Sequence, residues 1–416
     1  IDVTTTDAKL AAQIANAVAA AYIQSNRLEQ LRRDNPTAVP NPNWDTRRLW
    51  HESGPTLPPF GCKDCYQRTL CGGLQIEMAI FNCLTFCRCA DPTVCDNVCP
   101  RNPRHLVARS LEVGGFDLAN VPAAPRLDAP PLPSFVPLIY HRGSHKQVLK
   151  LEAAALPLAE LITRADGTLR FASRKALLDH FRLHDDCQLI LSGTDEDPTI
   201  ERWWRVHDRE AAIAGFRALG IVAITSPNYS LFVEVPRQDN FYNMKRIAVA
   251  WSELQREGLP AALHVNARTD RDWGRWAEFI AARPEVTLLA FEFGTGAGAK
   301  ARVGWHVGQL VQLAARVGRP LTLFVRGGSG YLTDLAKAFA KVIYIDTAPF
   351  VKTIKRRRAV HAEDFGISWE KAPTPQGEPL DALLQVNLEA CAAYVRLQLT
   401  RANTAAVDLS AGARAA

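Results

Sequence analysis

Short apolar runs alternate with amphipathic stretches between residues 140 and 400. The runs are rich in β-branched residues and apolar at successive positions, which is typical of parallel strands covered on both faces. They lie at 188–191, 220–225, 261–267, 286–293, 321–325 and 342–346. The stretches between them have the apolar spacing of surface helices, and they lie at 207–218, 244–257, 271–282, 304–317 and 331–340. The pattern predicts repeated β/α units.

The spacing of these units favours a closed sheet. They recur at roughly 30–40 residues, the length of a βαβ unit, and there are enough of them for a barrel. No Gly-x-Gly-x-x-Gly sequence follows the first run, which argues against a dinucleotide-binding fold. We therefore predict an α/β fold with a TIM-like (β/α) barrel, complete or incomplete. An open, doubly wound sheet is the alternative.

Changes in composition divide the chain into further segments. The stretch before the cysteine-rich segment is rich in proline and asparagine, and the stretch after it is rich in proline, which indicates linkers. We expect an N-terminal helix at 1–33, a linker at 34–60, a cysteine-rich metal-binding segment at 61–104, a Pro-rich linker at 105–139, the barrel at 140–400 and a frayed tail at 401–416.

Eight of the ten cysteines fall within one short segment, and they are Cys62, Cys65, Cys71, Cys83, Cys87, Cys89, Cys95 and Cys99. Disulfide scaffolds are typical of small secreted chains, whereas this segment precedes a large domain with its own core. The spacing therefore predicts metal binding in a reducing compartment, with buried free thiols or disulfides as the alternative.

The spacing of the cysteines predicts metal binding, but it does not decide which kind of metal centre they hold. Only Cys62 and Cys65 form the C-x2-C pair of zinc sites, and Pro100 follows Cys99 directly, as in some iron–sulfur segments, although the ferredoxin order is not matched. We expect an iron–sulfur cluster, with zinc as the alternative, and the number of centres stays open.

Polar residues gather where the predicted strands end, and chemistry in parallel barrels lies at those ends. His264, Asn266 and Arg268 alternate, so they share one face if the strand continues through them. Glu292 interrupts an apolar run, and a buried carboxylate needs a partner, which we expect to be Arg268 or Arg326. The predicted catalytic residues are Asp195, His264, Arg268 and Glu292, and Asn228 and Asn266 are candidate ligand-binding residues. A structural ion pair at the barrel rim is the alternative for Glu292.

Two glycine-rich loops follow strands and precede helices, at 294–298 and 326–330. Such loops present backbone N–H groups to phosphate, although they also serve as plain turns. A basic run follows at 352–358, which is either a phosphate-binding surface or a solvated helix face. The candidate ligand-binding residues here are Gly294, Gly296, Arg326, Gly327, Gly328, Lys355, Arg356, Arg357 and Arg358.

The net charge and the hydropathy of the chain limit the kinds of partner that can be expected. The formal charge is +6, which permits an anionic partner without requiring one. No run of about 18 apolar residues is present, so we expect no membrane-spanning helix. No basic segment with an apolar run opens the chain, so we expect no secretory signal and a cytoplasmic location.

Two stretches resemble known families. Residues 2–23 are similar to a short stretch of polysaccharide chain-length determinant proteins. We transfer no function from this similarity. The stretch 220–328, with SPNYSLFVEVPRQDNFYNMKR, ALHVNARTDRDW and FEFGTGAG, resembles an uncharacterised bacterial family of mobile-element-associated proteins. The barrel of that family has been likened to tRNA-guanine transglycosylases, in which one Asp attacks the ribose carbon and a second assists. By position, the resemblance implies these roles for Asp195 and Asp346, although no transglycosylase motif surrounds either.

The leading hypothesis is a metal-cluster-bearing barrel protein that acts on a nucleic acid or a nucleotide-like substrate, by base or glycosidic-bond chemistry. One alternative is a non-catalytic protein that binds nucleic acid or another anionic partner and has a structural metal site. Another is an enzyme acting on a small phosphorylated metabolite, which would need only the glycine loops.

Overall fold

The described chain consists of residues 103–128, 130–139, 145–163, 167–231, 237–294, 300–361, 366–375 and 377–412 of a computed structural model. The predicted N-terminal helix, the linker at 34–60 and all eight clustered cysteines lie outside these residues. The chain divides into two compact units. The described part of the first is 103–116, 237–242 and 268–270, and the second holds the remaining described residues.

Eight parallel strands form one sheet in the second unit, in the order β1-β8-β7-β6-β5-β4-β3-β2. Their bounds are β1 Phe135–Pro137, β2 Ala153–Pro157, β3 Gln188–Ser192, β4 Ile221–Thr225, β5 Ala261–His264, β6 Leu288–Glu292, β7 Thr322–Arg326 and β8 Lys341–Asp346. Beyond β1, the N–H of Ile139 donates to the carbonyl of Ala155 on β2 over 2.9 Å. This bridge joins the two edges, so the sheet is a TIM-like α/β barrel and not an open doubly wound sheet.

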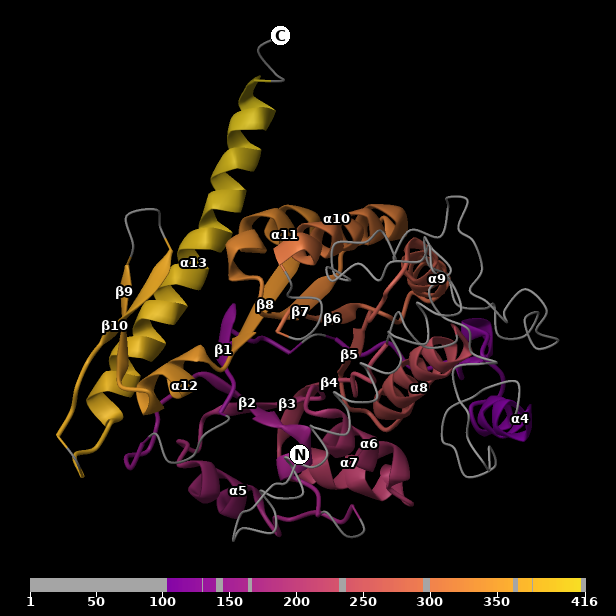
Figure 1. The fold of residues 1–416 in the computed structure, drawn as a ribbon, viewed down its shortest axis with the longest axis horizontal. Coiled ribbons are helices and arrows are strands. Elements are labelled where there is room, and N and C mark those ends of the chain that lie inside the picture. The colour runs from indigo at the N-terminus through magenta and orange to yellow at the C-terminus, as the bar shows by residue number, and fades with distance from the viewer. Residues whose placement is uncertain are drawn as a thin grey trace, which may run out of the picture. The chain divides into compact units, whose positions relative to one another are not determined.

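Helices surround this sheet (Figure 1). They are α5 Arg174–Phe181, α6 Asp197–Arg205, α7 Arg209–Ala218, α8 Arg237–Arg256, α9 Asp270–Ala281, α10 Lys300–Val317, α11 Leu332–Ala338, α12 Ala348–Ile354 and α13 Asp381–Gly412. Short 3-10 helices lie at η3 Leu118–Asn120, η5 Leu158–Glu160 and η7 Ser329–Tyr331. The sequence encodes the helix starts locally: for example, the Asp208 carboxylate accepts from the Ala211 N–H at 2.9 Å and caps α7.

Alternate residues of each strand belong to two different apolar clusters. One cluster takes residues from all eight strands and none from the helices, so it fills the barrel interior; it is Leu132, Val136, Leu138, Ala153, Ala155, Ile190, Ala223, Ala262, Leu288, Ala290, Phe324, Ile343 and Ile345. The residues between them, such as Leu289 and Phe291 of β6, pack against the helices. This period of two explains why the strands read as continuous apolar runs.

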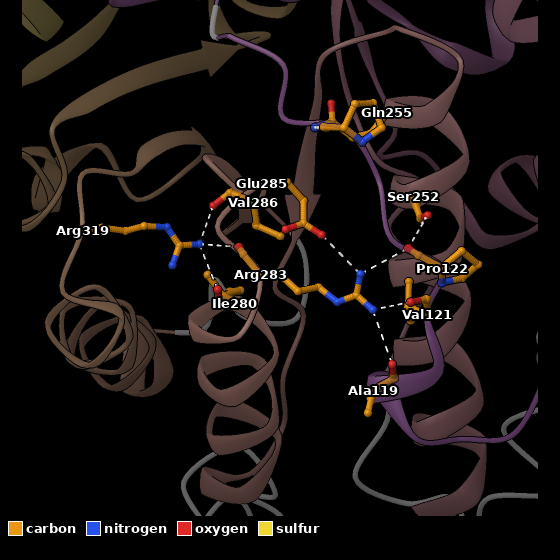
Figure 2. A network of polar contacts seen from close by, with 11 residues as sticks. Ala119, Val121, Pro122, Ser252, Gln255, Ile280, Arg283, Glu285, Val286 and Arg319 are labelled. Atoms are coloured by element: carbon orange, nitrogen blue, oxygen red, sulfur yellow. Dashed lines mark hydrogen bonds and ion pairs between the residues drawn. The ribbon is translucent and has the colours of Figure 1, made fainter.

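The Pro-rich stretch from Asp117 to Leu132 is an extended strap on the second unit. The prolines of the strap have no N–H, so it has more backbone carbonyls than backbone donors, and those carbonyls need partners from elsewhere. Arg283 donates to the carbonyls of Ala119, Val121 and Pro122 (Figure 2). Further donors reach other carbonyls of the strap: Lys245 to Asp117, Ser252 to Pro122, Gln255 to Pro125, Gln188 to Pro131 and Lys341 to Leu132.

The strap corrects the sequence interpretation of 105–139 as a linker. The strap leads directly into β1, and its Leu132, which is 3% exposed, belongs to the interior cluster. The prediction failed because side chains far away in sequence satisfy the strap's carbonyls. A second correction concerns the tail at 401–416, since α13 continues to Gly412.

The basic run at 352–358 spans three elements, so the interpretation as a single helix face is wrong. It begins in α12, turns at Lys355 and Arg356, and enters β9 Arg357–His361, which pairs antiparallel with β10 Ile367–Lys371. The chain reverses at Arg356, whose φ is +49°. Left-handed backbone is uncommon for residues other than glycine, so this turn could not be predicted from the residue types.

In the first unit, α4 Pro103–Glu112 contacts residues 239–242 of α8. Arg109 forms an ion pair with Asp239, and its guanidinium lies 5.0 Å from the centre of the Tyr242 ring. The Tyr242 hydroxyl donates to Glu112 at 2.8 Å. Polar and cation–π contacts therefore hold this part together.

Among the described helices, none combines the length and the apolar character that crossing a membrane requires.

Candidate functional site

A polar layer follows the apolar interior at the carboxyl ends of β3 to β7. Ser192, Thr225, His264, Glu292 and Arg326 each come two residues after an interior residue, so strand alternation directs them to the inner face. The first four are buried, at 3–5% exposure. The active sites of parallel barrels occupy this end, and buried polar groups there need partners.

Glu292 and Arg326 form the ion pair of this layer. They are register partners in the β6–β7 ladder, and Arg326 Nε lies 2.8 Å from Glu292 Oε2. The other carboxylate oxygen, Oε1, accepts from the Gly294 N–H at 2.5 Å. The prediction that a buried Glu292 pairs with Arg268 or Arg326 is confirmed for Arg326.

Burial raises the pKa of the Glu292 carboxyl to about 7. Loss of hydration disfavours the carboxylate more than Arg326 and the Gly294 N–H favour it, and nearby Asp346 raises the pKa further. The carboxyl therefore exchanges a proton near neutral pH, which is what a general acid or base requires.

Arg326 retains donors for another group. Only its Nε is used in the pair with Glu292, and the described residues supply no hydrogen-bond partner for the two terminal nitrogens. The side chain is 25% exposed, whereas that of Glu292 is 3% exposed. A guanidinium in this arrangement offers a planar fork that matches carboxylate or phosphate oxygens.

Asp346 ends β8 beside this pair. Its Oδ1 accepts from the Ala348 N–H at 2.8 Å. Burial raises the pKa of the Asp346 carboxyl to about 6, against the lowering effect of the Ala348 N–H and Arg326. Two carboxyls with raised pKa values thus flank one guanidinium.

His264 is buried at the end of β5, within a hydroxyl and carbonyl network. Its Nδ1 contacts the carbonyl of Ser226, which can only accept, so Nδ1 carries the proton. Nε2 is then an acceptor for the Thr194 hydroxyl at 3.3 Å. Burial lowers the pKa of His264 to about 4, and the charge of Arg326 lowers it further. The imidazole is therefore neutral at physiological pH.

Glycines allow the strand-end loops to pack closely. A Cβ on Gly193 would lie 2.3 Å from the Thr225 carbonyl. Gly327 has a φ of +74°, and a Cβ there would lie 2.9 Å from the Gly294 nitrogen. The Gly294 N–H donates to Glu292, and Gly327 packs against Gly294. These two glycines, which were predicted to bind phosphate, therefore help to shape the ion pair.

The other predicted residues are placed as follows. The side chain of Asn266 donates to Asn228 Oδ1 at 3.0 Å, so these two come together. The strand ends at His264, which removes the predicted face shared with Asn266 and Arg268, and Arg268 belongs to the first unit. Asp195 accepts from the Glu196 N–H at 2.8 Å at the start of α6, and among the described residues it forms no hydrogen bond or ion pair with Glu292 or His264. Gly296 lies outside the described residues.

The four basic candidates lie away from the strand ends, on the turn after α12 and on β9. Lys355, Arg356 and Arg358 are exposed, and Arg357 is half-buried. Arg357 donates to the carbonyl of Trp369 on β10 at 3.2 Å. These side chains form a surface and not a part of the polar layer.

Thr194 and Ser226 belong to the site but were not among the predicted residues. Both are hydroxyl residues directly after a strand, where such residues usually serve turns, so only their position at the strand ends was a signal. The described residues contain no group of three or more His, Cys, Asp or Glu side chains that could hold a metal ion.

No protein-family model matches this chain, and no curated protein matches it. The resemblance to the mobile-element-associated family therefore stays a prediction, and the site is interpreted from its own chemistry.

Proposed function

We propose that this protein is an enzyme that acts on a nucleotide-like substrate at the carboxyl ends of β5 to β8, by base or glycosidic-bond chemistry. The observation that carries the proposal is the pair of Glu292 and Arg326: a carboxyl whose pKa is about 7 beside a guanidinium with unused terminal donors. The guanidinium suits a phosphate, and the carboxyl suits proton transfer.

The residues of the layer have separate tasks in this proposal. Arg326 binds the substrate phosphate through its terminal nitrogens while Nε keeps Glu292 in place. Glu292, when protonated, donates its proton to the departing base, because a nucleobase leaves more readily when it is protonated. Solvent water replaces the base on the sugar carbon and releases a proton to the solvent, so the glycosidic bond is hydrolysed. Neutral His264 holds the Thr194 hydroxyl and keeps the wall of the site uncharged.

Calorimetry with adenosine monophosphate tests the binding step. We expect wild-type protein to bind, Arg326→Gln to lose at least about tenfold in affinity, and Arg326→Lys to be intermediate because lysine has no planar fork. Equal binding by all three proteins would contradict the role of Arg326.

Chromatography of free bases released from a single-stranded oligonucleotide tests the chemistry. We expect release by wild-type protein and a loss of about 100-fold or more in Glu292→Gln, which cannot transfer the proton. Binding of the monophosphate without any release would favour the alternative of a non-catalytic binding protein.

We also propose that the cysteine-rich segment at 61–104 holds an iron–sulfur cluster, with zinc as the alternative. The support is the concentration of eight thiols between Cys62 and Cys99. Anaerobically purified protein should contain iron and absorb broadly in the visible range. Zinc in a colourless protein would select the alternative, and neither metal above background would contradict both.

A further inference from the structure

The turn 355–356 with strands β9 and β10, here called the basic hairpin, carries more cations than carboxylates among its described residues. Its exposed cations are Lys355, Arg356, Arg358 and Lys371. Glu370 is the one carboxylate on the two strands, opposite Arg358 in the ladder. None of the four cations forms an ion pair with any described residue. The described residues of the hairpin therefore carry a net positive charge, which attracts an anionic partner.

The backbone of the hairpin is held in place at its base by contacts with α12 and α13. On α13, Asn387 accepts from the Ala359 N–H at 2.8 Å and donates to the Arg357 carbonyl at 2.9 Å. Lys352 of α12 stacks over the Trp369 ring at 5.3 Å. The Ala372 N–H donates to the carbonyl of Arg356 at 2.8 Å, which closes the left-handed turn. A backbone that is already ordered loses little conformational freedom on binding, so mainly the side chains must be ordered.

The hairpin is also connected to the candidate site. α12 begins two residues after Asp346 and ends directly before the turn at Lys355. A helix of seven residues spans about 10 Å, and Lys352 is close enough to Asp346 to stabilise its carboxylate. Positive charge thus extends from the end of β8 to the hairpin.

We propose that the basic hairpin binds the phosphate backbone of a single-stranded nucleic acid, one nucleotide of which enters the site at Glu292 and Arg326. This proposal rests on the proposed function for that site, and it makes the substrate a polynucleotide and not a free nucleotide. Cations spaced along an extended ribbon match repeating phosphates. A single strand is required because a base inside a duplex is inaccessible to the site.

Fluorescence anisotropy with a labelled single-stranded RNA of about twenty nucleotides tests the proposal, over about 0.05 to 0.3 M salt. The hairpin variant carries Lys355→Gln, Arg356→Asn, Arg358→Gln and Lys371→Gln, with Asn chosen because it tolerates the left-handed turn. The matched control removes four exposed cations from elsewhere on the second unit, as Lys150→Gln, Arg205→Gln, Arg217→Gln and Arg256→Gln.

We expect the hairpin variant to bind the RNA at least about tenfold more weakly, with a salt slope smaller by roughly 0.7 for each lost phosphate contact. The control variant should stay within about twofold of wild type, and circular dichroism should show both variants folded. Unchanged binding in the hairpin variant, or equal losses in both variants, overturns the proposal. Tighter binding of the same sequence as a duplex, or equal competition by polyglutamate, also overturns it.

Calorimetry with adenosine monophosphate separates this proposal from the proposed function. The hairpin variant should bind the monophosphate as wild type does, because Arg326 is unchanged. If wild type does not bind the monophosphate but RNA binding depends on the hairpin, the proposed site fails and the hairpin's role in RNA binding stands. If the monophosphate binds and the hairpin variant binds RNA normally, only the present proposal fails.

Discussion

Glu292 and Arg326 occupy the same rung of the β6–β7 ladder, and the Nε of Arg326 lies 2.8 Å from the Glu292 Oε2. Backbone pairing of the two strands therefore fixes which cation meets the buried carboxyl. The pair needs no loop to form it, and the Gly294 N–H supplies the second contact from the chain just beyond β6.

Replacement of Glu292 by Gln should change how stability depends on pH. The folded-state pKa of about 7 lies above the ordinary value of 4.5, so the folded protein holds a proton that the unfolded chain has lost. Stability must fall as pH rises from about 4.5 to 7, by about 3 kcal/mol from this group. Asp346, with its pKa raised to about 6, adds a fall of the same sign between its ordinary value of 3.8 and 6.

Urea unfolding at pH 5, 6, 7 and 8 measures this dependence. Glu292→Gln should be close to wild type at pH 5 and more stable than wild type at pH 8, because Gln resembles the protonated carboxyl. Glu278→Gln, at an exposed position on α9, is the control and should follow wild type throughout. Parallel curves for wild type and Glu292→Gln would contradict the raised pKa.

His264 should remain neutral down to about pH 4, with its proton on Nδ1. Its pKa of about 4 lies below the ordinary 6.5, so the unfolded chain binds a proton in this range and the folded protein does not. The contribution to stability is present above pH 6.5 and is lost as pH falls toward 4, opposite in sign to that of Glu292. Imidazole NMR signals report it, assigned by His264→Gln, and a midpoint near 6.5 would contradict the buried network.

Arg283→Ala should destabilise the second unit by about 2–4 kcal/mol, because it leaves the carbonyls of Ala119 and Val121 without this donor. Arg256→Ala, at an exposed position of α8, should change stability by less than about 0.5 kcal/mol. Denaturant unfolding measures both. If the two variants were equally stable, the strap would contribute little to holding β1 in the sheet.

Gly327→Ala should disturb the ion pair, because Gly327 has a φ of +74° and a Cβ there would lie 2.9 Å from the Gly294 nitrogen. We expect a loss of about 1–3 kcal/mol together with a lowered affinity for adenosine monophosphate. Gly330→Ala is the control in the same loop, since a Cβ there meets nothing within 4 Å. Similar stability and affinity in the two variants would show that the close packing of this loop is unimportant.

The sequence predicted β3 to β8 because strands that are covered on both faces have apolar residues at successive positions. β1 and β2 left weaker signals. β1 is three residues within a proline-rich stretch and is positioned by contacts distant in sequence. β2 reads AAALP, and alanine favours helices, yet the interior needs small side chains such as Ala153 and Ala155.

The candidate site was predictable where a residue broke an apolar pattern. Glu292 did so, and its need for a cation followed from the cost of burying a charge. Thr194 was not predictable, because its contact is with His264, which lies 70 residues away in the sequence. Arg268 was wrongly placed on the face of His264, because β5 ends at His264 although its neighbour β6 continues to Glu292, and the alternation of residues does not show where a strand ends.

Carbon-13 NMR of the Glu292 carboxyl, assigned by Glu292→Gln, tests the central claim most directly when it is titrated with and without adenosine monophosphate. We predict a midpoint near pH 7 in the free protein. The midpoint should move higher in the presence of the monophosphate, because a phosphate bound by Arg326 adds negative charge beside the carboxyl. A midpoint near the ordinary 4.5 that does not move with the monophosphate would contradict both the acid–base role of Glu292 and the binding role of Arg326.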